Sequence, residues 1–123
     1  MHALPMRHGG RALIRAHPAL PVIYATAYGT DSLYRAEHAE GYLTLVPQQW
    51  LFPEGKLTSS PAVFAKGTKL AVGGHYGVYV VTLDDKGRAT SDVVLARVFS
   101  HAVRALVYSP RFDRLYVGVE VSK

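Results

Sequence analysis

The chain has 123 residues, of which 49% are hydrophobic, and it carries a formal net charge of +5 from 14 basic and 9 acidic residues. This length fits one domain, and the composition supplies enough apolar side chains for a core, which argues against an intrinsically disordered chain. The absence of cysteine excludes a disulfide framework and any thiolate metal site. Residues 1–10 lack the apolar segment of a signal peptide, and no apolar run approaches the ~20 residues of a membrane helix. We therefore expect a soluble protein, for which a cytoplasmic location is favoured.

The basic residues do not gather in one block. They are dispersed among the predicted strands and turns and are mixed with acidic residues. Proteins that bind nucleic acids usually concentrate positive charge on one face, so nucleic-acid binding is not expected. The charge instead predicts a solvated basic surface.

Short runs of β-branched and aromatic residues, bounded by Gly, Pro and Asp, predict an all-β protein with antiparallel strands. No segment shows a helical period with caps, and residues 1–10 are expected to form a mobile leader. In chain order the ten predicted strands are residues 13–16, 22–27, 33–35, 42–46, 62–65, 69–73, 78–83, 93–99, 103–108 and 115–119.

One strand pattern returns at intervals of about 46 residues, which indicates a repeated β unit. Its three copies are Val22-Ile23-Tyr24-Ala25, Lys69-Leu70-Ala71-Val72 and Arg114-Leu115-Tyr116-Val117. We name the four strands of one unit a, b, c and d. Residues 1–123 then form a single β-repeat domain with units at about 11–58, 59–102 and 103–123, and the strands read abcd, abcd, ab.

The segment from residue 92 to 119 runs from an apolar d strand through a short loop to an apolar a strand, the Ser109-Pro110 turn and the b strand of the third copy. This order resembles the blade repeat of β-propellers of the lactonase-like and YVTN-repeat kind. The resemblance implies about two and a half propeller-like blades, completed by oligomerisation or belonging to a longer propeller, because closure needs about four blades. It also implies that an active site would lie at the end of the b–c loops.

The repeat places several chemically active side chains at equivalent positions. Tyr28, His75 and Glu120 end the three b strands. In a propeller the b–c and d–a loops share one face, which we call the b–c loop face. Asp31, Tyr76 and His101 lie in those same loops.

Imidazole, carboxylate and phenol groups on one face could bind a divalent metal or serve acid–base catalysis, with His75, His101 and Glu120 as the metal ligands. The alternative is that these loop side chains are satisfied by water or backbone groups. His17 lies in an a–b turn at the opposite end, where we expect it to help form the turn.

No phosphate-binding Gly-rich loop followed by a helix occurs, and the HExxH and Gly-x-Ser-x-Gly motifs are missing. The sequence therefore predicts a non-catalytic binding or interaction module, or a propeller fragment, of unknown specific function. A lactonase-like hydrolase with a site on the b–c loop face is the alternative, and a truncated reading frame without activity of its own is a third reading. Unpaired strand edges predict a homo-oligomer. The side chains expected in the core are Ile23, Leu70, Val72, Val80, Leu95, Leu106 and Leu115.

Overall fold

A computed structural model describes residues 12–27, 32–39, 42–49 and 57–120 of the chain. Within these ranges the protein consists of β-strands and one 3₁₀ turn, with no α-helix. The elements are β1 (Ala12–Ala16), β2 (Val22–Ala27), β3 (Ser32–Ala39), β4 (Tyr42–Gln49), β5 (Ala62–Phe64), η1 (Ala65–Gly67), β6 (Lys69–Gly73), β7 (Gly77–Leu83), β8 (Ala89–Val98), β9 (Val103–Ser109) and β10 (Arg114–Val119). Each predicted strand is present, so the all-β prediction is confirmed.

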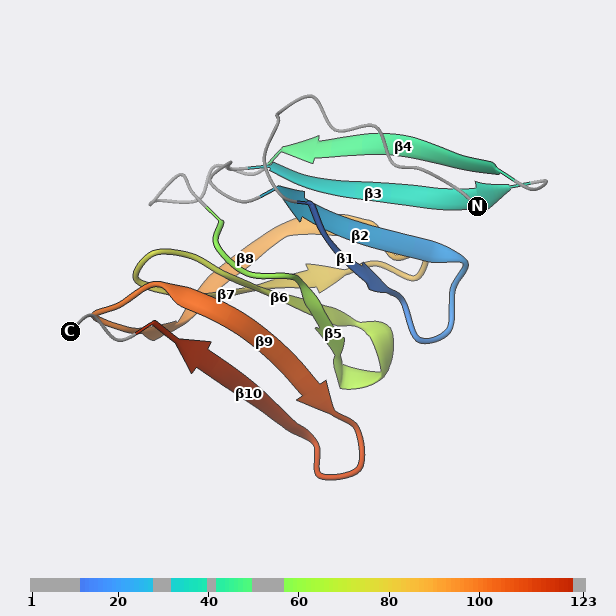
Figure 1. The fold of residues 1–123 in the computed structure, drawn as a ribbon. Helices are drawn as coiled ribbons and strands as arrows, with labels where there is room; N and C mark the ends of the chain where they lie inside the picture. Colours follow the sequence, from blue (N-terminus) through green and yellow to red (C-terminus); the bar gives the residue numbers. More distant parts are fainter. Residues whose placement is uncertain (1–11, 28–31, 40–41, 50–56, 121–123) are drawn as a thin grey trace.

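The strands form three antiparallel sheets, and each strand pairs with its neighbour in the sequence. The strand orders are β1-β2-β3-β4, β5-β6-β7-β8 and β10-β9. These sheets correspond to the predicted order abcd, abcd, ab. Figure 1 shows the sheets stacked face to face in chain order, with β5–β8 between the other two. The middle sheet can therefore bury both of its faces.

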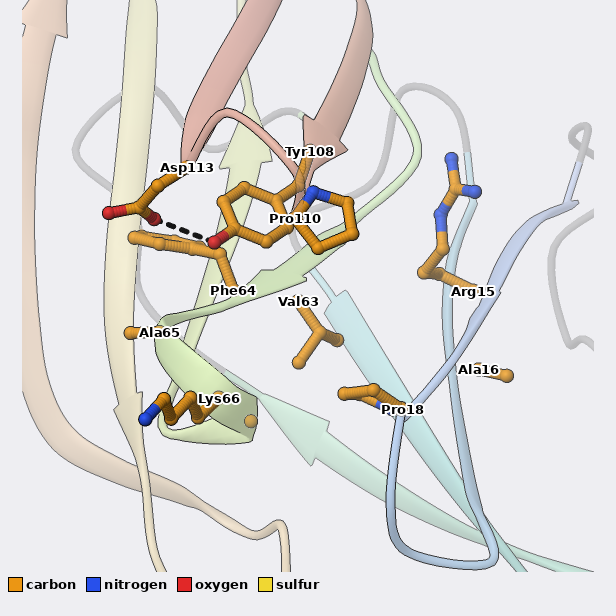
Figure 2. Close-up of a pocket in the computed structure, with 11 residues that line it drawn as sticks. Arg15, Ala16, Pro18, Val63, Phe64, Ala65, Lys66, Tyr108, Pro110 and Asp113 are labelled. Carbon is orange, nitrogen blue, oxygen red and sulfur yellow. Dashed lines mark hydrogen bonds between the residues drawn. The ribbon is translucent and has the colours of Figure 1, made fainter.

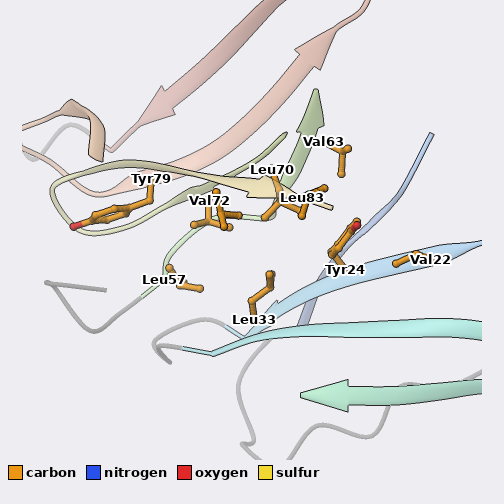
Figure 3. Packing of buried hydrophobic residues seen from close by; sticks show 10 residues of the cluster. Val22, Tyr24, Leu33, Leu57, Val63, Leu70, Val72, Tyr79 and Leu83 are labelled. Atoms are coloured by element: carbon orange, nitrogen blue, oxygen red, sulfur yellow. The ribbon is translucent and has the colours of Figure 1, made fainter. Parts of the chain in front are cut away.

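The first core lies between the sheets β1–β4 and β5–β8. Figure 3 shows Tyr24 and Leu33 of the first sheet and Leu70 and Val72 of the second between these two layers. All four side chains are buried, and Leu57, which precedes β5, joins them. Successive residues of a strand point to opposite faces, so Leu70 and Val72 share this side of β6.

The second core lies on the other side of the middle sheet. Ala71 of β6 packs there against Val103 and Leu106 of β9, and Leu115 and Val117 of β10 contribute partly buried side chains. The alternation of Leu70, Ala71 and Val72 along one strand thus serves two separate cores. This explains why these three successive positions are all apolar and do not alternate with polar residues.

The predicted core is confirmed at Leu70, Val72 and Leu106, which are buried. Three further positions, Ile23, Val80 and Leu115, are partly buried. The prediction for Leu95 is wrong, because 46% of this residue is exposed. Leu95 lies on β8, the outermost strand of its sheet, which pairs with β7 alone. The residues next to Leu95 in the sequence are as apolar as those of a central strand. The sequence pattern therefore does not reveal that the strand lies at the edge of its sheet.

Candidate functional site

The loops of the predicted b–c loop face are joined by backbone hydrogen bonds. Val103 N donates to Gly74 O at 3.0 Å, and Phe99 N donates to Tyr76 O at 2.7 Å. Glu120 N donates to Ala102 O at 2.9 Å. The β6–β7 loop, the β8–β9 connection and the residue that follows β10 therefore meet at one end of the stacked sheets.

The predicted residues of this face have different surroundings. His75 and Tyr76 are neighbours, with ring centroids 6.2 Å apart. The carboxylate of Glu120 accepts a hydrogen bond from Arg104 Nε at 2.8 Å and also contacts Arg104 Nη2. Tyr28 and Asp31 lie outside the described residues.

His75, His101 and Glu120 all belong to the described part of the chain. Within that part, no group of three or more His, Asp or Glu side chains could hold a metal ion. The use of the b–c loop face for binding or acid–base chemistry stays a prediction.

A second candidate surface is the outer side of the β9–β10 hairpin. Along β10, the residues Leu115, Val117 and Val119 are partly buried, whereas Arg114, Tyr116 and Gly118 are exposed. The partner of Tyr116 on β9 is Val107, and each is 53% exposed. One side of the hairpin thus belongs to the second core, and the other side presents apolar groups to solvent.

A cavity of about 800 Å³ lies at the end opposite to the b–c loop face. It is surrounded by the first strand of each sheet, β1, β5 and β9, and by the three a–b turns at residues 17–21, 65–68 and 110–113. In Figure 2 the lining residues Val63 and Pro18 lie in the middle of the view, with the rings of Phe64 and Tyr108 on one side and Arg15 on the other.

The backbone around this cavity is strained. Ala65, Lys66 and Asp113 have φ values of 52°, 55° and 50°, and they are the non-glycine residues with positive φ in the described ranges. All three line the cavity. Left-handed conformations are costly for residues with a Cβ atom, and they often occur at binding sites.

Two side chains hold the strained turns in place. Thr68 donates to Ala65 O from its backbone N at 3.1 Å and from its hydroxyl at 2.7 Å. The Tyr108 hydroxyl donates to Asp113 Oδ1 at 2.6 Å. This contact and the negative charge of Asp113 raise the pKa of Tyr108 above its usual value.

His17 ties the first a–b turn to the second. Its Nδ1 accepts hydrogen bonds from the backbone N–H groups of Ala19 and Leu20, both at 3.0 Å. Nε2 therefore carries the hydrogen and donates to Gly67 O at 3.1 Å. A Cβ atom at Gly67 would lie 2.5 Å from His17 Cε1, so this contact needs glycine. The expected role of His17 in its turn is confirmed, and the bond to the next sheet adds to it.

The sequence does not point to the cavity through reactive side chains, because the predicted site residues lie in loops at the other end of the sheets. The repeat alignment did contain a signal. It superposes the turn that holds Pro18 on the turn that holds Pro110, and it places Lys66-Gly67 in the same register. Three equivalent turns must lie at one end of the stacked sheets, so the meeting of these residues could have been predicted.

Comparison with known proteins gives no relative: the chain matches no protein-family model, no curated protein and no solved structure. None of its described helical segments has the length and apolar character needed to cross a membrane. The proposed function therefore rests on the fold class and on the geometry of the candidate sites.

Proposed function

We propose that the chain is a non-catalytic, β-propeller-like interaction module that forms a homodimer by pairing β10 with the β10 strand of a second copy. The observation that carries the proposal is the open edge of β10. Among the residues that the structure describes, β10 pairs with β9 alone. An open strand edge is a template for another strand, and β10 contains neither a proline nor a charge after Arg114 to prevent such pairing.

The residue pattern of β10 suits a copy of itself. In a symmetric antiparallel pair centred on Val117, Arg114 of each copy lies opposite Glu120 of the other, because both are three positions from Val117. Tyr116 lies opposite Gly118 in the same pairing. Opposite charges and an aromatic ring across a bare glycine are both favourable cross-strand pairs.

The test is the mass of the purified protein in solution, measured by sedimentation equilibrium between about 1 and 100 μM, a range that detects dimers of micromolar affinity. We expect a dimer, and we expect Tyr116→Lys to weaken it at least about tenfold by removing the ring and placing a charge at the edge.

Val107→Lys is the matched control. Val107 has the same exposure and lies on the same sheet face, but it belongs to β9, on the side of the hairpin away from the outer edge of β10. The dimer should persist in this variant. A wild-type monomer over the whole range, or equal loss of the dimer in both variants, would overturn pairing through the edge of β10.

A further inference from the structure

We infer that the cavity between the strands β1, β5 and β9 and the a–b turns binds a small, mainly apolar carboxylate, with Arg15 as the group that binds the acid. This site is separate from the β10 edge. A volume of about 800 Å³ lies within the range of about 300–1,000 Å³ that is usual for small-molecule sites. The walls are apolar, with a few polar groups, as such sites commonly are.

Arg15 is oriented by its own contacts. Its Nε donates to Pro61 O at 3.2 Å, across the space between β1 and the start of β5. This bond uses one of the five N–H groups of the guanidinium and leaves the N–H groups of both Nη atoms for a ligand. The N–H groups of the two Nη atoms suit the two oxygens of a carboxylate, because the fork of the guanidinium matches their spacing.

Arg15 differs from two other arginines of the chain. Arg35 has an ion pair with Glu37 at 2.7 Å, and Arg104 has one with Glu120. No carboxylate of the described residues lies within ion-pair distance of Arg15. An arginine held in place beside an apolar cavity, without an acidic partner from that part of the chain, is suited to an acidic ligand.

The opposite wall suits the apolar part of the ligand. The rings of Phe64 and Tyr108 have centroids 5.9 Å apart and stand across Val63 and Pro18 from Arg15. The carboxylate of Asp113 lies beyond these rings and is engaged by the Tyr108 hydroxyl (Figure 2). Arg15 and the Asp113 carboxylate are thus at opposite ends, and Lys66 of the second a–b turn is the third charged residue of the lining. An acid with a ring or chain would direct its carboxylate toward Arg15, whose guanidinium offers the forked geometry that the lysine ammonium lacks.

The strained turns fix the shape of this wall before a ligand binds. Ala65 and Asp113 keep their left-handed conformations through contacts with Thr68 and Tyr108 that need no ligand. A site that is already formed loses less conformational entropy on binding. We therefore expect the same turn geometry in the free and the bound protein.

The experiment titrates the protein with 2-naphthoate and with its neutral analogue 2-naphthamide. Binding is followed by calorimetry and by the methyl NMR signals of Val63, which lines the cavity. We expect the acid to bind at least about tenfold more tightly than the amide, and the ring of the ligand to shift the Val63 signals. Equal affinities for both compounds, no binding at millimolar concentration, or unchanged Val63 signals would each overturn the inference.

Arg15→Gln should reduce the affinity for 2-naphthoate to that for 2-naphthamide. Arg88→Gln is the matched control, since it removes the same charge from an exposed arginine outside both the cavity and the β10 edge. This variant should bind 2-naphthoate as the wild type does. If Arg15→Gln does not fold, Arg15→Lys replaces it, because lysine keeps the charge but loses the forked geometry, and the affinity should still fall. An unchanged affinity in the folded Arg15 variant would contradict the role of Arg15.

Discussion

The polar side chains buried between the first two sheets share one kind of partner, a backbone carbonyl of the neighbouring sheet or its connections. The Tyr24 hydroxyl donates to Gly87 O at 2.6 Å, and Arg35 Nε donates to the same oxygen at 3.2 Å. The Thr26 hydroxyl donates to Ser59 O at 2.9 Å. Carbonyl groups in turns lack strand partners, so these bonds satisfy both the turn and the buried side chain.

Replacement of Tyr24 by phenylalanine tests the value of one such bond. Tyr24→Phe removes the hydroxyl and leaves Arg35 Nε as a donor to Gly87 O. We expect the free energy of unfolding, measured with urea, to fall by about 1–2 kcal/mol. Tyr116→Phe is the control, because Tyr116 is exposed, and its effect should be close to zero. Equal effects of the two changes would contradict a stabilising role for the Tyr24 bond.

Alkaline pH should act through the same tyrosine. Burial raises the pKa of Tyr24 from 10.0 to about 12, with the positive charge of Arg35 opposing this rise and the negative charge of Asp84 adding to it. Ionisation is therefore easier in the unfolded chain than in the folded protein. The contribution of Tyr24 to stability is complete below pH 10 and is lost as the pH rises to about 12.

Urea denaturation of the wild type and of Tyr24→Phe between pH 9 and pH 12.5, about the window set by the two pKa values, measures this loss. The difference between the two proteins should shrink through the window. It isolates Tyr24 from Tyr108, whose pKa is also raised, because both proteins retain Tyr108. A constant difference would show that Tyr24 ionises equally in both states.

At the scale of strands, the sequence predicts which segments form paired strands, but it does not predict where each strand ends. The β3 strand was predicted as residues 33–35 but runs over Ser32–Ala39, since the polar residues after Arg35 still pair with β4 through their backbones. The polarity of the side chains indicates which face of a strand is buried. It does not indicate where the backbone hydrogen bonds of the strand end. The same limit applies to the predicted core. Its seven positions were chosen for their apolar character, but the exposure of Leu95 depends on the position of its strand at the edge of the sheet.

The contact between Arg104 and Glu120 shows why the candidate site was only partly predictable. Gly118 pairs with Ala105 and Val119 pairs with Val103, so Arg104 is left over in a β-bulge. The bulge lies at the end of β10, where the Arg104 side chain reaches the Glu120 carboxylate. The repeat alignment places Glu120 at the end of its strand, but a bulge depends on the pairing of two strands and has no sequence signal of its own here.

Leucine truncations test the two cores separately. Leu70 belongs to the first core and Leu106 to the second, and both are fully buried. We expect Leu70→Ala and Leu106→Ala each to lower the free energy of unfolding by about 2–5 kcal/mol in urea denaturation. Leu95→Ala should cost much less, because this side chain is largely exposed. A near-neutral effect at both buried positions would contradict the layered arrangement.

At the scale of the whole molecule, the middle sheet has a partner on each face, whereas the third sheet has two described strands and one packed face. The cavity and the β10 edge follow from the same layering. The first strands of three successive sheets enclose the cavity at one end, and β10 offers its outer edge. The two proposals therefore concern separate parts of the molecule and can be tested independently.

A charge exchange provides the sharpest test of how two molecules would associate through that edge. In the proposed pairing, Arg114→Glu puts two like charges opposite each other at both ends of the paired strands, so the dimer should weaken at least about tenfold in sedimentation equilibrium at low salt. Adding Glu120→Arg restores opposite charges across the interface, but it also replaces the ion pair of Glu120 with Arg104 by two like charges, so the double variant should recover part of the affinity. Both variants keep Val117 and Tyr116, so the apolar part of the contact is unchanged. A double variant that associates no better than Arg114→Glu would show that these two residues do not face each other, and it would exclude the register centred on Val117.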